Sequence, residues 1–196
     1  MTAIYENYES PWMDDELSIL RDAANRFFST EFVPHKDRWI EQGKVDRDAW
    51  NKAGEAGLLC AEIPAQYGGG GGDYRHETIV TEEQLGAGIS GFGNQVHSQI
   101  VAPYLLHYGN EEQKQKWLPK MATGEMVGAI AMTEPNTGSD LQNVKTSATK
   151  KGDSYVINGA KTYITNGIHA DLVVLVAKTD PNLGAKGISL IIVEAN

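Results

Sequence analysis

The chain has little cysteine and little positive charge. Cys60 is the single cysteine among 196 residues, so no disulfide forms within the chain and no multi-cysteine metal cluster is built. This usage is typical of reducing compartments, and we expect a cytoplasmic location. The 17 Lys and Arg are outnumbered by 26 Asp and Glu, which gives a formal net charge of −9. Without a basic surface to neutralise phosphates, nucleic acid and anionic membranes are excluded as expected partners.

Long apolar runs and several enzyme signatures are also missing. The sequence has no apolar run long enough to cross a bilayer, and its first ten residues have no basic segment followed by an apolar one. We therefore expect neither a membrane span nor a secretory signal. The histidines show no H-E-x-x-H spacing, Ser139 is not in a G-x-S-x-G turn, and no P-loop lysine follows the glycine run 68–72. These absences disfavour zinc hydrolases, α/β-hydrolases and P-loop nucleotide binders.

The first part of the chain, to about residue 124, has helical periodicity. Apolar side chains recur three and four residues apart after Asp14, which we expect to cap a helix. Pro34 is expected to interrupt or restart that helix, and Asp46 to open a second one that ends near Gly57. Further helices are predicted over residues 75–85, 94–108 and 110–124, and Asn110 is expected to cap the last of them.

The remainder of the chain has the pattern of strands. Asn158-Gly159 stands between two β-rich runs and predicts a hairpin, and residues 151–153 predict a second turn. Helices followed by strands indicate an α+β fold rather than a parallel α/β fold. The last strand ends close to Asn196, and we expect an unpaired sheet edge there. The predicted strands cover residues 127–132, 144–150, 155–157, 161–164, 172–177 and 188–193.

Two polar segments are the candidates for chemistry. Residues 133–140 read Thr-Glu-Pro-Asn-Thr-Gly-Ser-Asp, and residues 163–167 read Tyr-Ile-Thr-Asn-Gly. Their hydroxyls and backbone N–H groups suit the edge of a planar cofactor that gains negative charge on reduction. Tyr163 and Thr165 alternate with Ile164, so on a strand they share one face. Each segment in isolation is more typical of an ordinary turn or strand, and only their combination favours a cofactor site.

In combination, these segments resemble the acyl-CoA dehydrogenase family. Ile130-Ala131-Met132-Thr133-Glu134-Pro135 with Gly138-Ser139-Asp140-Leu141 is similar to the family's first signature, and residues 155–167 resemble the segment that follows it. The resemblance covers essentially the whole chain and is closest to the long-chain type. It implies an all-α helical domain over residues 1–124. The first part of a mainly antiparallel, β-barrel-like middle domain follows over residues 125–196, without the family's C-terminal helical domain.

The resemblance also implies FAD as the cofactor and gives individual residues a role. Thr133 matches a threonine at the pyrimidine edge of the flavin, and Thr165 matches one whose hydroxyl approaches N5. Tyr163 stands where the family has an aromatic, often tryptophan, on the flavin face away from the substrate. Ser139 matches a serine associated with the acyl-CoA substrate. The full set expected to bind the cofactor is Ile130, Ala131, Met132, Thr133, Ser139, Tyr163, Ile164 and Thr165.

The implied activity is that of an oxidoreductase in fatty-acid oxidation, the α,β-dehydrogenation of acyl-CoA thioesters. Electrons pass to an electron-transfer flavoprotein, and the full-length protein is expected to be a homo-oligomer, a tetramer in the family. The family's base is a glutamate of the C-terminal domain, so no catalytic residue is assigned here and Glu134 is left to the flavin loop. We expect this chain alone to bind FAD weakly and to be inactive. Asn136 and Thr137 replace the family's usual Gly-Ala pair and are expected to narrow the loop.

Two alternatives remain open at the level of sequence. Acyl-CoA oxidases and flavin monooxygenases have a related architecture and differ in whether oxygen reaches the reduced flavin, although the Thr-Glu-Pro wording at residues 133–135 favours a dehydrogenase. The second alternative is a short, non-catalytic binding or assembly module that recruits another strand through its unpaired β-edge. It predicts self-association or a partner chain.

Overall fold

The helical part of the chain begins where the sequence predicts. The computed structural model describes residues 10–195, and in it Asp14 caps the first helix by accepting a hydrogen bond from Leu17 N at 2.9 Å. Asn110 caps the last helix in the same way, through Gln113 N at 2.9 Å. These side chains satisfy N–H groups that the first turn of a helix leaves without partners. The helices are α1 (Asp15–Phe27), α2 (Lys36–Gln42), α3 (Asp48–Glu55), α4 (Tyr74–Gly86), α5 (Asn94–Val96), α6 (Ala102–Tyr108) and α7 (Glu111–Ala122).

The link from α1 to α2 and the start of α3 could be placed only from the structure. A π-helical turn and a short 3-10 turn link α1 to α2, and Pro34 lies in the second, so the chain stays helical around it. Asp46 was expected to open α3, but that helix begins at Asp48 and has no side-chain cap. The carboxylate of Asp46 instead accepts a hydrogen bond from Arg38 at 2.9 Å, and this bond holds the pKa of Asp46 well below its usual range.

Aromatic side chains fill the core between these helices. The ring centroid of Phe32 lies 5.1 Å from that of Trp39 and 5.0 Å from that of Phe92, with both pairs edge-on. Trp50 packs against Phe92 at 4.4 Å, and all four side chains are buried. Edge-to-face contacts add to the stabilisation that comes from burying large apolar areas. The helical part therefore has a substantial core of its own.

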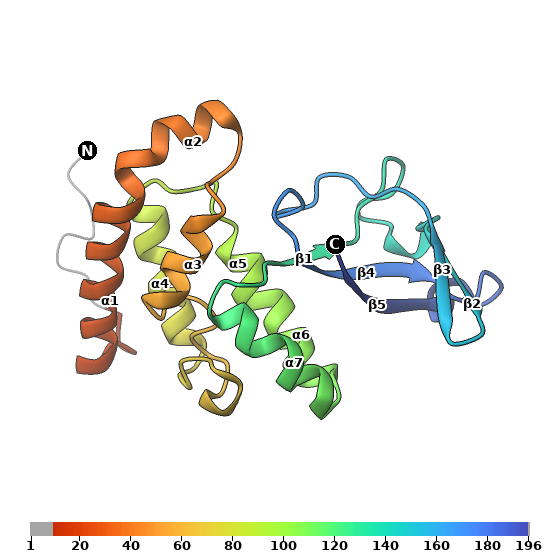
Figure 1. Ribbon diagram of the computed structural model, residues 1–196, viewed down its shortest axis with the longest axis horizontal. Coiled ribbons are helices and arrows are strands. Elements are labelled where there is room, and N and C mark those ends of the chain that lie inside the picture. Colours follow the sequence, from red (N-terminus) through yellow and green to blue (C-terminus); the bar gives the residue numbers. More distant parts are fainter. Residues whose placement is uncertain (1–9, 196) are drawn as a thin grey trace.

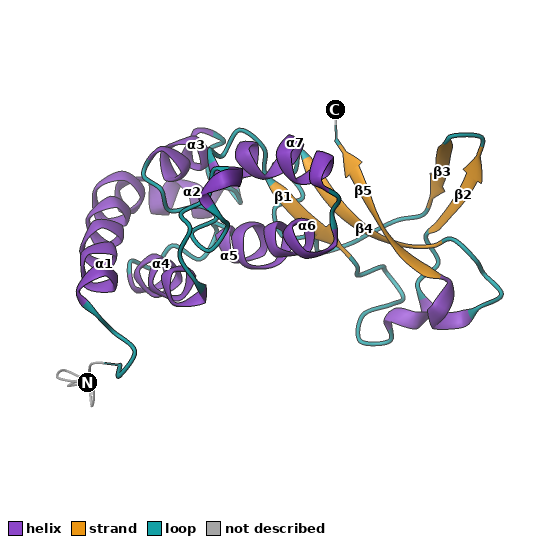
Figure 2. Ribbon diagram, turned by 90° about the horizontal axis from the view of Figure 1, so that it is seen from below, coloured by secondary structure: helices purple, strands orange, loops and turns teal. Residues whose placement is uncertain are grey.

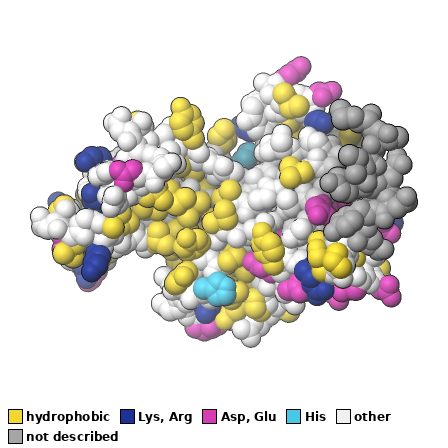
Figure 3. Space-filling model, turned by 180° about the vertical axis from the view of Figure 1, so that it is seen from behind, with side chains coloured by type: hydrophobic (Ala, Val, Ile, Leu, Met, Phe, Trp, Pro, Cys, Tyr) yellow, Lys and Arg dark blue, Asp and Glu magenta, His cyan; other side chains and the backbone are white. Residues whose placement is uncertain are grey.

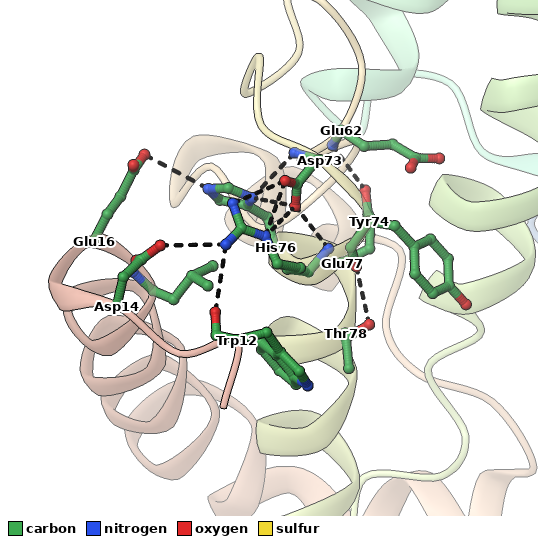
Figure 4. A network of polar contacts seen from close by, with 11 residues as sticks. Trp12, Asp14, Glu16, Glu62, Asp73, Tyr74, His76, Glu77 and Thr78 are labelled. Atoms are coloured by element: carbon green, nitrogen blue, oxygen red, sulfur yellow. Dashed lines mark hydrogen bonds and ion pairs between the residues drawn. The ribbon is translucent and has the colours of Figure 1, made fainter. Parts of the chain in front are cut away.

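The start of α4 is tied to the start of α1 (Figure 4). Asp73 caps α4, and Arg75 donates to the carboxylates of Asp73 at 2.9 Å and of Asp14 at 3.3 Å. One turn along α4, Glu77 is fully buried, and its Oε1 accepts a hydrogen bond from Glu62 N at 3.3 Å. Burial raises the pKa of Glu77 to about 7, because its charged form is poorly solvated there.

The strands form one open sheet beside the helices (Figures 1 and 2). Strand β4 is central: β1 pairs with it in parallel and β5 pairs with it antiparallel. Strands β2 and β3 form an antiparallel hairpin that joins β4 through the single pair Ser147 and Lys178. The predicted α+β class is confirmed. The strands are β1 (Gly128–Ala131), β2 (Ser147–Lys151), β3 (Ser154–Asn158), β4 (Leu172–Lys178) and β5 (Ile188–Glu194).

The sheet is open rather than a closed barrel within the described residues, in keeping with the unpaired edge that the sequence predicts. The sheet runs in the order β1-β4-β2-β3 with β5 also on β4, and no pairing joins β3 back to β1 or β5 within residues 10–195. A barrel needs every strand edge to be paired, and here the hairpin contacts β4 at one end only and leaves all of β3 exposed. Both long pairings, β2 with β3 and β4 with β5, are antiparallel as expected.

One predicted hairpin does not form. The sequence predicts a turn at Asn158-Gly159, but residues 161–164 are not a strand. The chain returns toward the end of β1 instead, where Thr162 N donates to Thr133 O at 2.9 Å. The other predicted turn, at residues 151–153, does form and joins β2 to β3. Hydrogen bonds to a distant segment thus override the local preference of Asn-Gly for a hairpin.

Helices and sheet share one apolar junction. Leu172 and Val174 of β4 are buried in a cluster with Leu105 of α6 and Leu118 of α7. On the opposite face of the sheet only a small cluster forms, around Leu175. Seen from behind, apolar side chains gather near the middle of the molecule, where the helices meet the sheet (Figure 3). The junction therefore anchors β4 against α6 and α7.

Polar bonds fix how the chain leaves the helical part. Arg47 at the start of α3 donates to Gly124 O at 2.8 Å, to Glu125 O at 2.7 Å and to the carboxylate of Asp171 at 3.2 Å. The same carboxylate accepts a hydrogen bond from Val127 N at 2.8 Å, immediately before β1. These contacts set the direction in which β1 leads toward the candidate site.

Candidate functional site

Strand β1 carries the first predicted site residues. Ala131 is buried in the small cluster on one face of the sheet, and Ile130 packs on the junction at the other face. Met132 and Thr133 follow at the end of the strand and are half-buried. Because β1 is held along β4, its pairing determines where these last two residues emerge.

The second predicted segment lies directly against this end of β1. Lys161 Nζ donates to Met132 O at 2.9 Å, across a separation of 29 residues. Next to it, Thr162 N donates to Thr133 O at 2.9 Å. The structure therefore brings the two polar segments together, although Lys161 and Thr162 do not belong to a strand.

Glu134 holds this arrangement in place. Its buried carboxylate accepts hydrogen bonds from Lys145 N at 2.6 Å, Thr146 N at 2.9 Å and Lys161 Nζ at 2.9 Å. Burial acts to raise the pKa of Glu134, but the hydrogen bonds from Thr146, Lys145 and Lys161 outweigh it and lower the pKa to about 2. Glu134 is therefore a charged structural anchor whose oxygens are occupied, and it is poorly suited to abstract a proton.

Residues 163–167 form a turn. Gly167 N donates to Ile164 O at 2.9 Å, so Tyr163 and Thr165 do not share one face of a strand as expected. Tyr163 is 93% exposed and its φ is 55°, in the left-handed region that side chains rarely adopt. A large aromatic ring held exposed on a strained backbone is a feature of ligand-binding surfaces.

A cleft of about 250 Å³ lies between this turn and the helical part. Thr165 and Ile164 line one side of it, and Trp50 of α3 lines the other. No acidic side chain of the described residues lines the cleft. Its wall is completed by Gly43, Lys44, Val45, Ser90, Gly91, Gly93, Asn166, Gly167, Ile168 and His169.

Ser139 does not line this cleft. It is exposed in the loop after β1, and no hydrogen bond of the described residues joins it to residues 163–167. The loop is closed at its base by Glu134 N to Thr137 O at 2.8 Å. Asn136 is exposed, whereas Thr137 turns inward and donates to Asn143 O at 3.3 Å. Of these two side chains only that of Asn136 projects from the loop, and a narrowing of the approach to flavin stays a prediction for it.

Sequence reasoning gave no role to several residues that shape this region. Asn166 donates to Gly93 O and Gly128 O, and His97 accepts from Gly128 N, so both bind the first residue of β1. Asn166 belongs to the polar segment 163–167, but its position in that segment does not predict which groups it binds. His97 lies at the start of the π-helical turn that follows α5, and it is fully buried.

Residues 10–195 contain neither a metal-binding cluster nor a helix that could span a membrane. No group of three or more His, Cys, Asp or Glu side chains within residues 10–195 is arranged to hold a metal ion. None of the helices in the same range is long and apolar enough to cross a membrane.

Comparison with family models decides the classification. Residues 14–125 match the model described as acyl-CoA dehydrogenase, N-terminal domain, and residues 129–196 match the model of the middle domain. The chain belongs to the acyl-CoA dehydrogenase family. The resemblance carried by the two polar segments is thereby confirmed.

Individual relatives agree with this membership. Long-chain specific acyl-CoA dehydrogenase, mitochondrial, of Mus musculus is 45% identical over 181 residues, which are 91% of this chain and 42% of that protein. A crystal structure of acyl-CoA dehydrogenase from Geobacillus kaustophilus matches with a TM-score of 0.93 and 46% identity, over 96% of this chain and 50% of that one. A glutaryl-CoA dehydrogenase from Mycobacterium smegmatis in complex with FADH2 matches with a TM-score of 0.83 and 27% identity, over 93% and 46%. The chain thus spans about half the length of these relatives.

Proposed function

We propose that these residues form the flavin-binding and substrate-positioning portion of an acyl-CoA dehydrogenase, an oxidoreductase that introduces an α,β double bond into acyl-CoA thioesters. The observation that carries the proposal is the contact between the end of β1 and residues 161–165, where the two family segments meet through Lys161 and Thr162. Family membership gives that contact its chemical meaning. A glutaryl-CoA dehydrogenase with the same fold is bound to FADH2.

The free donors at this contact fit FAD. The hydroxyls of Thr133 and Thr165 make no hydrogen bond to any described residue, so both remain available to a ligand. Tyr163 offers an exposed ring for stacking on a planar group. We assign Thr133 to the pyrimidine edge of the flavin and Thr165 to the region of N5. When bound, FAD supplies the acceptor for the hydride that leaves the substrate.

The acyl group has a place beside these donors. The cleft between residues 164–169 and the helical part opens next to Thr165, and Trp50 and Val45 give it an apolar wall. We propose that the acyl portion of the substrate enters this cleft, where the helical part excludes water from it. Ser139, exposed on the loop after β1, is proposed to contact the acyl-CoA from outside the cleft.

The proton acceptor is proposed to lie outside these residues. No acidic side chain lines the cleft within the described part, and Glu134 is ionised but fully engaged by three donors. A base needs a free oxygen within hydrogen-bond reach of the proton that it removes. We therefore expect a chain limited to these 196 residues to bind FAD weakly and to have no dehydrogenase turnover.

The remaining assignments follow from family membership. An electron-transfer flavoprotein is proposed as the electron acceptor, and the protein that contains this chain is proposed to assemble as a homo-oligomer, a tetramer. A cytoplasmic location is proposed from the low cysteine content. Size measurement by light scattering and fractionation of the source cells test the last two.

The decisive experiment is an assay of the protein expressed from its full gene. We expect FAD to co-purify with this protein. We also expect the protein to catalyse the reduction of a dye by straight-chain acyl-CoAs. Thr165→Val, which removes the hydroxyl at constant shape, should slow the reaction about tenfold, as expected for one lost hydrogen bond. Thr149→Val on the exposed face of β2 is the matched control and should leave the rate unchanged.

Each other outcome rejects part of the proposal. Absence of bound flavin together with absence of dye reduction would leave the non-catalytic assembly module, which predicts self-association instead. Hydrogen peroxide produced in place of reduced dye would indicate an oxidase. Equal rates for Thr165→Val and the parent protein would remove Thr165 from the assignment while the reaction itself stood.

A further inference from the structure

The first residue of β1 is held on both of its backbone groups by side chains from other parts of the chain. The N–H of Gly128 donates to Nδ1 of His97 at 2.9 Å, and the carbonyl oxygen of Gly128 accepts from Nδ2 of Asn166 at 3.1 Å. Asn166 Nδ2 also donates to Gly93 O at 2.9 Å, immediately before α5. One amide group therefore joins the turn at residues 163–167 to β1 and to the helical part at once.

The geometry of Asn166 is specialised for this contact. Its φ is 66°, in the left-handed region that asparagine tolerates better than most residues. Its backbone oxygen accepts a hydrogen bond from His169 N at 2.8 Å, which continues the turn. Gly93 allows the close approach, because a Cβ on it would lie 2.1 Å from Asn166 Oδ1 and 2.8 Å from Thr165 Cγ2. Thr165 thus sits against the helical part without a side-chain hydrogen bond of its own.

His97 completes the arrangement from the helical side. Burial lowers the pKa of His97 to about 4, so its ring is neutral near pH 7 and Nδ1 keeps a lone pair for Gly128 N. Its Nε2 donates to Met121 O at 3.0 Å, and this bond fixes the tautomer. Gly128 is therefore firmly held, and Asn166 transmits that position to the neighbouring Thr165.

We propose that Asn166 is a positioning residue, which sets Thr165 against β1 and the helical part and thereby tunes the bound flavin and the alignment of substrate with it. The inference rests on the proposed function, because it assigns Thr165 to the flavin. Asn166 lines the cleft, but both hydrogens of its amide nitrogen are taken by the backbone carbonyls of Gly93 and Gly128, so it has no donor left for a ligand. Its effect on chemistry is therefore indirect, through the place of Thr165.

The first test replaces the amide by a carboxylate of the same shape in the protein expressed from its full gene. Asn166→Asp keeps the tolerance for a left-handed backbone but loses both donors and faces two carbonyl oxygens. We expect flavin affinity to fall about tenfold, the flavin absorption spectrum and reduction potential to shift, and the single-turnover rate with acyl-CoA to fall about a hundredfold. The matched control is Asn182→Asp, the same charge change on an exposed turn residue.

The second test displaces the turn that carries Thr165 and Asn166 without removing any hydrogen-bond donor. Gly93→Ala adds a methyl group where Thr165 Cγ2 and Asn166 Oδ1 now lie, so the turn has to shift. We expect the same direction of change in spectrum and potential as for Asn166→Asp. Gly86→Ala is the control, because a Cβ on Gly86 meets open space.

The outcomes separate the inference from the function that it rests on. A parent protein without bound FAD or acyl-CoA oxidation refutes the proposed function before any variant is compared. A working parent, with both variants unchanged in flavin spectrum, potential and single-turnover rate, refutes the positioning role. Variants that lose only thermal stability, with the spectrum and potential of their bound flavin unchanged, also refute it, as does failure of both variants to fold, since Asn166 would then be a structural residue only.

Discussion

The helical part and the sheet part of this molecule are stabilised in different ways. In the helical part, large aromatic side chains such as Phe32, Trp50 and Phe92 pack together in one core. The smaller cluster of the sheet part, around Leu175, is built mainly from alanines, and all of β3 is exposed. The sheet part is held instead by polar anchors, of which the buried Glu134 is the clearest.

The two parts also have different roles, one as a scaffold and the other as the region that carries the candidate site. A close-packed aromatic core has low compressibility, so it suits a scaffold. Polar anchors fix backbone at defined points and leave neighbouring donors such as those of Thr133 and Thr165 free for a ligand. The candidate site lies on the side of the molecule that is held by hydrogen bonds, and the scaffold supplies the wall against which it is built.

The largest effect should come from the aromatic core. Phe92→Ala removes a fully buried ring that contacts Phe32 and Trp50, and we expect the free energy of unfolding to fall by about 3–5 kcal/mol. Urea titration measures it. Val156→Ala on the exposed β3 is the counterpart and should cost about 0.5 kcal/mol or less. Similar losses for the two variants would mean that the two parts do not differ in their source of stability.

A smaller effect is expected from the polar anchor of the sheet part. Lys161→Met leaves Glu134 buried with two backbone donors but no cation, and the free energy of unfolding should fall by about 3 kcal/mol. The double variant Glu134→Gln with Lys161→Met should recover part of this loss, because no unpaired charge remains. Hydrogen exchange would locate the change. Loss of protection in α1 rather than around residues 133–137 would contradict the assignment of the anchor to the sheet part.

The smallest effect concerns pH and separates two groups of the helical part. The pKa of Glu77 is raised to about 7, so its contribution to stability is complete at low pH and is lost as pH rises toward 7. The pKa of His97 is lowered to about 4, so its contribution is complete above its unfolded value and is lost as pH falls toward 4. From about pH 4.5 to about pH 6.5, the stabilising contribution of Glu77 falls as pH rises while that of His97 grows. We therefore expect little net change in the free energy of unfolding over this range.

Glu77→Gln should expose the opposing slope. Without the titrating carboxyl, the free energy of unfolding should rise with pH by about 1 kcal/mol per pH unit in that range, because only His97 remains. Urea titrations at several pH values compare the variant with the parent. The ionisable neighbours of Glu77 are Glu62, Cys60 and His76, and all three are the same in the variant and the parent protein. Parallel pH profiles for the two proteins would show that Glu77 does not titrate as inferred.

The sequence predicted local elements well and distant contacts poorly. Asp14 and Asn110 act at short range, and both caps are where the pattern placed them. Asp46 has the same residue type, but Arg38 one helix away captures its carboxylate. The predicted hairpin at residues 158–159 failed for the same reason, because Lys161 and the residue after it bind the end of β1 instead.

The candidate site shows the same division between what is local and what is not. The pattern indicated both polar segments and named Thr133 and Thr165, and their binding roles remain predictions. It did not indicate that Tyr163 lies in a left-handed turn, or that Asn166 bridges to the helical part. Left-handed backbone at a tyrosine is locally unfavourable, so no propensity predicts it, and tertiary contacts have to hold it.

By itself, the sequence determined that helices precede strands, the caps at Asp14 and Asn110 and the family segments, because each depends on residues within a few positions of one another. The tertiary structure alone decided that Glu134 is an anchor rather than a free acid, and that Asn166 and His97 meet at Gly128. Those features depend on hydrogen bonds between segments far apart in the chain. The geometry of these hydrogen bonds follows from how the helical core and β4 pack. Local sequence patterns do not predict that packing.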